Sequence, residues 1–267
     1  MERRVVITGL GAITPIGNNL NETWKGIENK ECGIDNISLF DSSNFKTSLC
    51  AEVKNYNVLD YFEQKQAKRL DRISQFALIA TREAVKNSGI TPENTDFKRV
   101  GVFVSSGIGG LITIQNQCEV NCKKGNNRVS PMFIPMSIAN MPAGNISIEF
   151  GFKGKSMAIV TACSSSTDSI GEGYRTIKHG YEDVIVAGGT EASICPAGIA
   201  GFENMKALCT SADKNRASIP FDKERSGFVM GEGSGILILE ELEHAKKEML
   251  KYMQKLLDLI QLQMLTI

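Results

Sequence analysis

Apolar runs and amphipathic stretches alternate along the chain. Five short apolar runs, several of them rich in Val and Ile, predict buried strands. These runs lie at residues 3–8, 100–105, 158–161, 183–187 and 235–240. Apolar residues at helical spacing predict helices at residues 20–28, 67–88, 111–122, 166–178 and 241–247, with shorter helical pieces within 131–150. Because strands alternate with amphipathic helices, the pattern indicates a layered α/β fold.

Glycines gather where predicted strands end, and glycine allows the backbone to approach a ligand or another segment closely. Residues 9–17 contain breakers such as Gly9, Gly11 and Pro15, and we predict a glycine-rich loop there. The spacing also imitates a dinucleotide-binding fingerprint. Thr14 replaces the third glycine, however, and no acidic partner closes a second strand, so a structural loop is favoured over nucleotide binding.

The chain has 267 residues and a formal net charge of zero, so it can form one large domain or two small ones. A balanced charge argues against general affinity for nucleic acid or for an anionic membrane surface. No apolar segment is long enough to span a bilayer. The first apolar run is β-branched and broken by glycines, without a small-residue cleavage site, so we interpret it as a core strand and not as a signal peptide.

The seven cysteines indicate reduced thiols in a cytoplasmic protein. They form no Cys-x-x-Cys pair, and no histidine-rich spacing accompanies them. Cys118 and Cys122 are four residues apart, which suits one face of a helix, but no further ligand cluster accompanies them. We therefore predict no metal site.

Cys163 is the strongest candidate for chemistry. It follows an apolar run and precedes small hydroxyl residues that lead into a helical pattern, in Ile159-Val-Thr-Ala-Cys-Ser-Ser-Ser-Thr-Asp168. A strand would deliver the thiol to a sharp turn, and the following helix would direct its free N–H groups and the positive end of its dipole at the sulfur. The thiolate, which is the reactive form, is favoured in such a place. A buried, inert cysteine is the alternative.

Neither histidine of the chain offers an obvious base for this thiol, although a cysteine enzyme usually needs a base or a proton relay. His179 lies beside a glycine at a predicted helix end, and His244 lies among charged residues of a polar helix, so we predict that both are surface residues. Residues 231–235 place a serine between glycines, but a strand follows where a nucleophile elbow needs a helix. We predict a tight turn there, or backbone packed near the site.

Five sequence blocks carry a resemblance to a known family. They are residues 4–17 (RVVITGLGAITPIG), 106–110 (SGIGG), 161–166 (TACSSS), 187–191 (AGGTE) and 220–233 (PFDKERSGFVMGEG). In this order they resemble the β-ketoacyl-acyl carrier protein synthases, and among them the type II elongating enzymes. Ser164 and Ser165 stand where many bacterial relatives have Ala and Gly, a conservative departure that other condensing enzymes share.

The resemblance implies a thiolase-like α-β-α layered fold made of two similar halves, working as a homodimer when full length. Residues 1–247 would form the N-terminal half. Cys163 matches the acyl-accepting nucleophile, and its own backbone N–H matches one oxyanion-hole donor. Two groups of residues match the walls of the acyl pocket: Ile108 and Phe202 in their own subunit, and Phe133 and Ile134 reaching into the pocket of the partner subunit.

The implied activity is the decarboxylative Claisen condensation of fatty acid elongation. Acyl carrier protein delivers an acyl group to Cys163, and a malonyl group on the carrier protein then loses CO₂ and attacks it. No metal or organic cofactor is implied. The family docks its acidic carrier protein on a basic surface, for which Lys65, Lys68, Arg69 and Arg72 are the candidates here.

Residues 248–267 do not resemble the family, whose second half carries two catalytic histidines, a lysine and a gating phenylalanine. An amphipathic helix is one interpretation of this tail. Back-translation with permitted codons suggests another: if Lys246 and Lys247 are encoded by a run of A, one added A opens a frame that can read Lys-Lys-Arg-Asn-Ala-Lys-Ile-Tyr-Ala, which closely resembles the family after this helix. We therefore expect residues 248–267 to be out of frame and the second half to be encoded downstream.

Three other functions stay open. The chain could be a polyketide-type condensing subunit, a truncated inactive fragment or pseudogene product, or a partner resembling a chain-length factor. The retained Cys163 opposes the last of these, because such partners usually lack the nucleophile.

Overall fold

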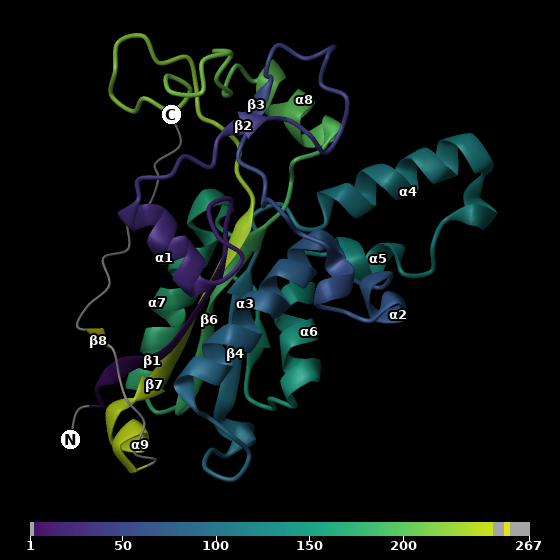
Figure 1. The fold of residues 1–267 in the computed structure, drawn as a ribbon. Coiled ribbons are helices and arrows are strands. Elements are labelled where there is room, and N and C mark those ends of the chain that lie inside the picture. Colours follow the sequence, from purple (N-terminus) through teal and green to yellow (C-terminus); the bar gives the residue numbers. More distant parts are fainter. Residues whose placement is uncertain (1–2, 248–253, 257–267) are drawn as a thin grey trace.

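The computed structural model describes residues 3–247 and 254–256 and has a mixed central sheet between layers of helices (Figure 1). The strand order is β5-β4-β6-β7-β1-β8. The strands are β1 (Val5–Ile13), β4 (Val100–Ser105), β5 (Ser156–Met157), β6 (Val184–Glu191), β7 (Gly233–Glu241) and β8 (Gln254–Leu256). β4 pairs in parallel with β5 and β6, whereas β7 runs antiparallel to both β6 and β1. The predicted layered α/β fold is therefore confirmed.

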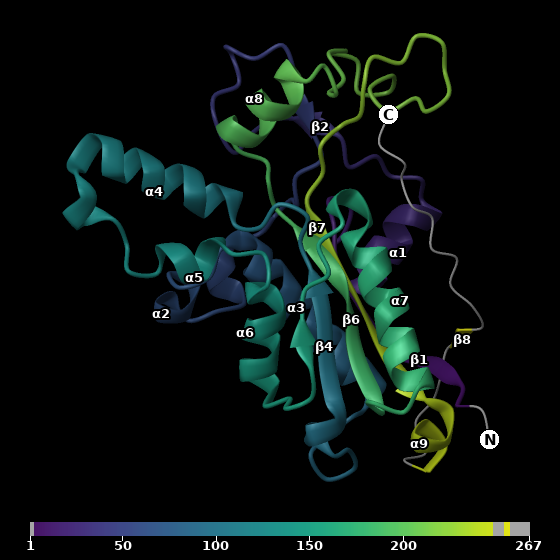
Figure 2. The same ribbon diagram turned by 180° about the vertical axis from the view of Figure 1, so that it is seen from behind.

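Helices cover both faces of the sheet. α3 (Arg72–Ser88) and α6 (Met141–Phe150) pack on one face, and α7 (Ser165–Lys178) packs on the other (Figure 1, Figure 2). Side chains alternate accordingly along β4. Val102 belongs to the apolar core beneath α3, and its neighbour Phe103 belongs to the core beneath α7. A strand buried on both faces requires this alternation of apolar side chains.

The remaining elements surround this core. They are α1 (Leu20–Glu28), α2 (Gln64–Ala67), α4 (Leu111–Lys124), α5 (Phe133–Ser137), α8 (Pro196–Asn204), α9 (Leu242–Lys247), the short strands β2 (Asp35–Asn36) and β3 (Leu49–Cys50), and the 3-10 turns η1 (Val58–Asp60), η2 (Phe97–Arg99), η3 (Asn126–Arg128) and η4 (Ala162–Ser164). α8 and the β2–β3 pair lie together beyond the end of the sheet where β4 and β6 finish, and α4 projects away from the body (Figure 1). This small layer has an apolar core of its own, built from Ile37, Cys50, Ile194, Ile199, Leu208 and Met230.

β1 continues through the glycines that predict a loop, so the predicted loop at residues 9–17 is wrong for its first part. A Cβ on Gly9 would lie 2.2 Å from the carbonyl oxygen of Ala84, and a Cβ on Gly11 would lie 1.9 Å from that of Ala80. The two glycines therefore let α3 pack directly against the strand backbone. This close packing accounts for the spacing that imitates a dinucleotide-binding fingerprint.

α3 begins later than its periodicity predicts. The pattern predicts one helix over residues 67–88, whereas the short helix α2 ends at Ala67 and α3 begins at Arg72. Asp71 causes the break, because its backbone is extended and its side chain accepts the Ile73 N–H at 3.1 Å. A carboxylate in this position caps a helix and satisfies one of its free N–H groups.

The predicted strand at residues 158–161 is wrong, since β5 ends at Met157. The backbone N–H groups of Ile159 and Thr161 donate to side-chain hydroxyls and not to a neighbouring strand. Ser105 Oγ, for example, accepts the Ile159 N–H at 2.8 Å. Because a hydroxyl group replaces the ladder hydrogen bond, the chain leaves the sheet several residues before it reaches Cys163.

Only a small part of the C-terminal tail is described. β8 pairs antiparallel with the first residues of β1, Val5 to Ile7, so the helical interpretation is wrong for Gln254–Leu256. The rest of the tail predicted to be out of frame, residues 248–253 and 257–267, lies outside the described residues.

Candidate active site

Cys163 lies at the end of the sheet where β4 and β6 finish. It occupies the turn η4, which leads directly into α7, and it is exposed, so the alternative of a buried cysteine is wrong. The preceding residue, Ala162, has a φ of 54°. A left-handed φ is strained for a residue with a Cβ. The strained turn presents the thiol at the N-terminal end of a 14-residue helix, where free N–H groups and the positive dipole end point outward.

Hydroxyl groups hold this turn in place. Ser165 Oγ accepts the Thr161 N–H at 2.8 Å and donates to the Ala162 carbonyl at 2.6 Å. The Thr161 hydroxyl donates to the carboxylate of Asp168, which lies in the first turn of α7. Ser164 Oγ donates to the same carboxylate at 3.3 Å. The hydroxyl residues around the cysteine thus fix the backbone that carries it.

A cavity of about 730 Å³ opens beside Cys163. Ile108 and Phe202 both line it, so the structure brings together three of the residues that the sequence singles out. The rings of Phe202 and Phe228 meet edge to face, with centroids 5.5 Å apart, and add an apolar wall. Residues 231–235 also line the cavity, which confirms that their backbone packs near the site.

Phe133 and Ile134 lie apart from this cavity. Both belong to α5, and neither is among the residues that line it. Ile134 is 60% exposed, so this chain alone does not bury it.

Sequence reasoning missed Glu191. This residue ends β6, lines the cavity, and accepts hydrogen bonds from Ser106 Oγ and from the Gly107 N–H, both at 2.9 Å. Burial raises the pKa of its carboxyl above the usual value, although the hydrogen bonds act in the opposite direction. Two signals in the sequence point to it: Glu191 follows two glycines at the end of an apolar strand, and it ends the block 187–191 that carries part of the family resemblance.

A second carboxylate of the cavity is engaged in an ion pair. The side chain of Glu232 is 0% exposed; it binds Arg72 Nη2 at 2.6 Å and accepts the Val53 N–H at 2.9 Å. The Arg72 guanidinium also lies over the rings of Tyr56 and Phe76, with Cζ 4.8 Å and 4.6 Å from their centroids. Arg72 therefore holds the fold together, and its predicted place on a basic docking surface is wrong.

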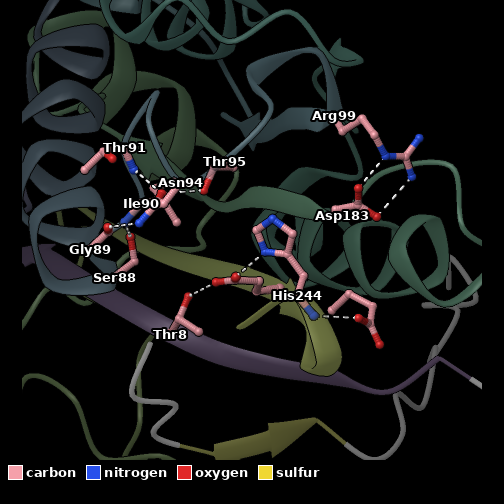
Figure 3. A network of polar contacts seen from close by, with 12 residues as sticks. Thr8, Ser88, Gly89, Ile90, Thr91, Asn94, Thr95, Arg99, Asp183 and His244 are labelled. Atoms are coloured by element: carbon pink, nitrogen blue, oxygen red, sulfur yellow. Dashed lines mark hydrogen bonds and ion pairs between the residues drawn. The ribbon is translucent and has the colours of Figure 1, made fainter. Parts of the chain in front are cut away.

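Neither histidine lies at the cavity. His179 is the exposed C-cap residue of α7, at the opposite end of that helix from Cys163. His244, predicted to be a surface residue, is only partly exposed: 20% of its side chain is accessible, and its Nδ1 lies 2.6 Å from Glu240, whose side chain is 0% exposed. Thr8 Oγ1 donates to the same carboxylate at 2.9 Å, and Figure 3 shows His244 and Thr8 on either side of it. Glu240 lies within β7, at the end of the apolar run that predicts this strand, so the sequence does not indicate that it is the buried partner of His244.

Three cations of the predicted docking surface are exposed, namely Lys65, Lys68 and Arg69.

Among residues 3–247 and 254–256, no three His, Cys, Asp or Glu side chains are grouped as a metal site requires. No helix of those same residues is both long enough and apolar enough to cross a membrane.

The fold is that of the thiolase-like ketosynthases. A type II polyketide ketosynthase, solved in complex with its acyl-carrier protein and bound to the hexaketide, aligns with a TM-score of 0.82 and 29% identity over 94% of this chain and 61% of its own. The ishigamide ketosynthase/chain length factor aligns with a TM-score of 0.86 and 28% identity over 96% of this chain and 62% of its own.

The chain belongs to the beta-ketoacyl synthase family, whose N-terminal domain matches residues 2–245. The 3-oxoacyl-[acyl-carrier-protein] synthase 2 of Staphylococcus aureus (strain N315) is 44% identical to it over 91% of this chain, and the protein of the same name from Synechocystis is likewise 44% identical over 91%. The match covers 59% of each of these relatives, so the chain spans about three fifths of their length.

Proposed function

We propose that this chain supplies the nucleophile and the acyl pocket of a 3-oxoacyl-acyl carrier protein synthase of fatty acid elongation, acting in the cytoplasm. One observation carries the proposal. The exposed Cys163, at the N-terminal end of α7, opens onto a cavity of about 730 Å³ that Ile108 and Phe202 wall. This volume suits an apolar chain, since small-molecule pockets commonly measure about 300–1,000 Å³. Burial of the acyl chain against these side chains favours its binding.

The first step is acyl transfer. Cys163 Sγ attacks the carbonyl carbon of an acyl thioester on the carrier protein, the old C–S bond breaks, and the carrier's thiolate leaves and takes up a proton. The attacking sulfur lies at the N-terminal end of α7, where the helix dipole is positive. The backbone N–H of Cys163 donates to the developing oxyanion, and a donor of this kind contributes about 3–4 kcal/mol to transition-state stabilisation.

The second step is condensation. A malonyl thioester loses CO₂, and the resulting enolate carbon attacks the acyl carbon held by Cys163. The enzyme's C–S bond then breaks and regenerates the thiolate, and the product is a β-ketoacyl chain two carbons longer. His179 and His244 both lie away from the cavity, so neither of them stabilises the enolate in this proposal. The proposed chemistry uses no metal and no organic cofactor.

Two protein contacts complete the proposal. Lys65, Lys68 and Arg69 are exposed and offer positive charge to an acidic acyl carrier protein. Phe133 and Ile134, which lie outside their own chain's cavity, reach the pocket of a partner subunit in a homodimer. The exposure of Ile134 supports this second contact.

Incubation with an acyl-acyl carrier protein tests the first step. Mass spectrometry should find one acyl group on the peptide that contains Cys163 and none in a Cys163→Ala variant. Cys118 is also exposed, on α4, and serves as a control within the same molecule. Equal acylation of Cys118, or acylation of Cys163→Ala to the same extent, would contradict the proposal.

We also propose that residues 1–247 form the N-terminal synthase domain and that residues 248–267 are read out of frame. The back-translated sequence beyond Lys246 and Lys247 supports this. Sequencing the coding DNA across residues 246–248 should reveal a missing A and an open second-half frame downstream; no such frame would refute the idea. In an elongation assay with malonyl-carrier protein, the reframed protein should turn over and the 267-residue product should not.

A polyketide-type condensing subunit is the second candidate function. It is favoured by the solved ketosynthases that align over 94–96% of the chain, whereas the higher identity of 44% favours elongation of fatty acids. The product of the reframed protein separates the two. One condensation before release indicates fatty acid elongation, and repeated condensations on one chain indicate polyketide synthesis.

A further inference from the structure

The loop of residues 106–110, which carries one wall of the cavity, is held by a single carboxylate at its near end. Glu191 Oε1 accepts the hydroxyl of Ser106, and its Oε2 accepts the Gly107 N–H, each at 2.9 Å. Ser106 Oγ in turn accepts the Gly109 N–H at 2.8 Å. Both oxygens of the carboxylate therefore bind the first turn of this loop.

The same loop packs against the turn that carries the nucleophile. A Cβ on Gly107 would lie 3.0 Å from the carbonyl oxygen of Ala162 and 3.2 Å from Glu191 Oε2. Gly107 thus lies between the carboxylate and the strained residue that precedes Cys163. Ile108 follows directly and lines the cavity. A shift of the loop would move the wall and the nucleophile relative to each other.

The far end of the loop has independent anchors. Gly110 donates its N–H to the Ser137 carbonyl at 2.9 Å. Thr113, at the start of α4, donates its N–H and its hydroxyl to Asp71 at 3.1 Å and 2.5 Å. Loss of Glu191 should therefore release the near end of the loop and leave the far end in place.

We propose that Glu191 is a positioning residue. It sets the separation between Ile108 and Cys163 and thereby the length of acyl chain that the cavity accepts at the thiol. This inference rests on the proposed acyl site. Its two oxygens accept hydrogen bonds from the loop that carries Ile108.

Alkylation of Cys163 tests the proposal without requiring a complete enzyme. The second-order rate constants for alkylation by N-octyl iodoacetamide and by iodoacetamide are measured at the Cys163 peptide. The ratio of the two, divided by the same ratio at Cys118, is the preference of Cys163 for the octyl probe. The variants are Glu191→Ala, Glu191→Gln and Ser106→Ala, with Glu182→Ala as the matched control. Glu182 is buried and, like Glu191, accepts a backbone N–H, that of Lys155 at 2.9 Å, but it lies just before β6, at the end opposite the cavity.

The parent should prefer the octyl probe at Cys163. Glu191→Ala should lower this preference about tenfold, the equivalent of one or two lost hydrogen bonds. Glu191→Gln, which keeps an acceptor for Gly107, should retain most of it, and Glu182→Ala should retain all of it. If Glu191→Ala proves insoluble, Ser106→Ala must show a loss in the same direction.

Three outcomes would overturn the inference. The first is an unchanged preference for the octyl probe in Glu191→Ala or, where that variant fails to fold, in Ser106→Ala. The second is an equal loss of this preference in Glu191→Gln and Glu191→Ala. The third is an equal loss of it in the control Glu182→Ala. A parent protein without any chain-length preference at Cys163 would instead refute the acyl site itself, which keeps the two failures distinct.

Discussion

Two carboxylates line the cavity and differ in what they bind. Glu191 faces uncharged donors, the Ser106 hydroxyl and the Gly107 N–H, and burial without a cation raises the pKa of its carboxyl. Glu232 faces the guanidinium of Arg72. The same residue type therefore orders a loop in one place and forms a buried ion pair in the other. Neither role is visible in the sequence, because each depends on residues that are distant along the chain.

Removal of the Glu232 carboxylate should be strongly destabilising. In Glu232→Ala, the Arg72 guanidinium stays over the rings of Tyr56 and Phe76 without its counter-ion, and a broken buried pair costs about 3 kcal/mol. Urea unfolding of the parent and the variant measures the difference. Glu224→Ala removes a carboxylate that pairs with Arg216 but is 79% exposed, and it should change the midpoint little. Equal effects of the two substitutions would contradict the assignment.

Close packing of one helix on one strand determines the middle of the fold. Gly9 and Gly11 keep β1 free of side chains where α3 crosses it, and this packing, which periodicity cannot detect, is why part of a strand reads as a loop. The apolar runs that predict β4, β6 and β7 are reliable because both faces of those strands are buried. The run at residues 158–161 fails for a different reason: Ser105 takes the N–H of Ile159 away from any ladder.

Two glycine-to-alanine substitutions should therefore have opposite outcomes. In Gly11→Ala, the new Cβ would lie 1.9 Å from the Ala80 carbonyl oxygen, so β1 and α3 must separate and the variant should unfold at a much lower temperature or be insoluble. In Gly201→Ala, nothing lies within 4 Å of the new Cβ in the middle of α8, so stability should rise by about 0.5–1 kcal/mol. Thermal unfolding measures both, and similar midpoints for the two variants would contradict the packing described here.

At the scale of the whole molecule, polar contacts join segments that are far apart in the sequence. Asp183, just before β6, binds Arg3 ahead of β1 and Arg99 ahead of β4, and Figure 3 shows Arg99 pointing at its carboxylate. The sequence blocks predict the family, the layers and the place of the thiol. They do not predict such ion pairs, because three charged residues among many surface charges have no distinguishing pattern.

The free energy of unfolding should fall in acid, and Asp183 should account for part of the loss. Burial alone would raise the pKa of its carboxyl, but hydrogen bonds from Arg99 and Arg3 outweigh burial and hold the pKa below its usual value of 3.8. A group with a lowered folded-state pKa contributes stability that is complete above its unfolded-state pKa. That contribution is lost as the pH falls through the folded-state pKa.

Urea unfolding of the parent and of Asp183→Asn, from about pH 7 down to about pH 2, isolates this contribution. The difference between them should be constant above about pH 5 and should shrink below about pH 4. Asp71→Asn gives a control of opposite sign, because burial raises the pKa of Asp71 and its contribution must grow as the pH falls through that raised value. If the Asp183→Asn difference stayed constant throughout, the two arginines would not be stabilising the ionised carboxylate, and the contacts of Asp183 would have to contribute to stability independently of its charge.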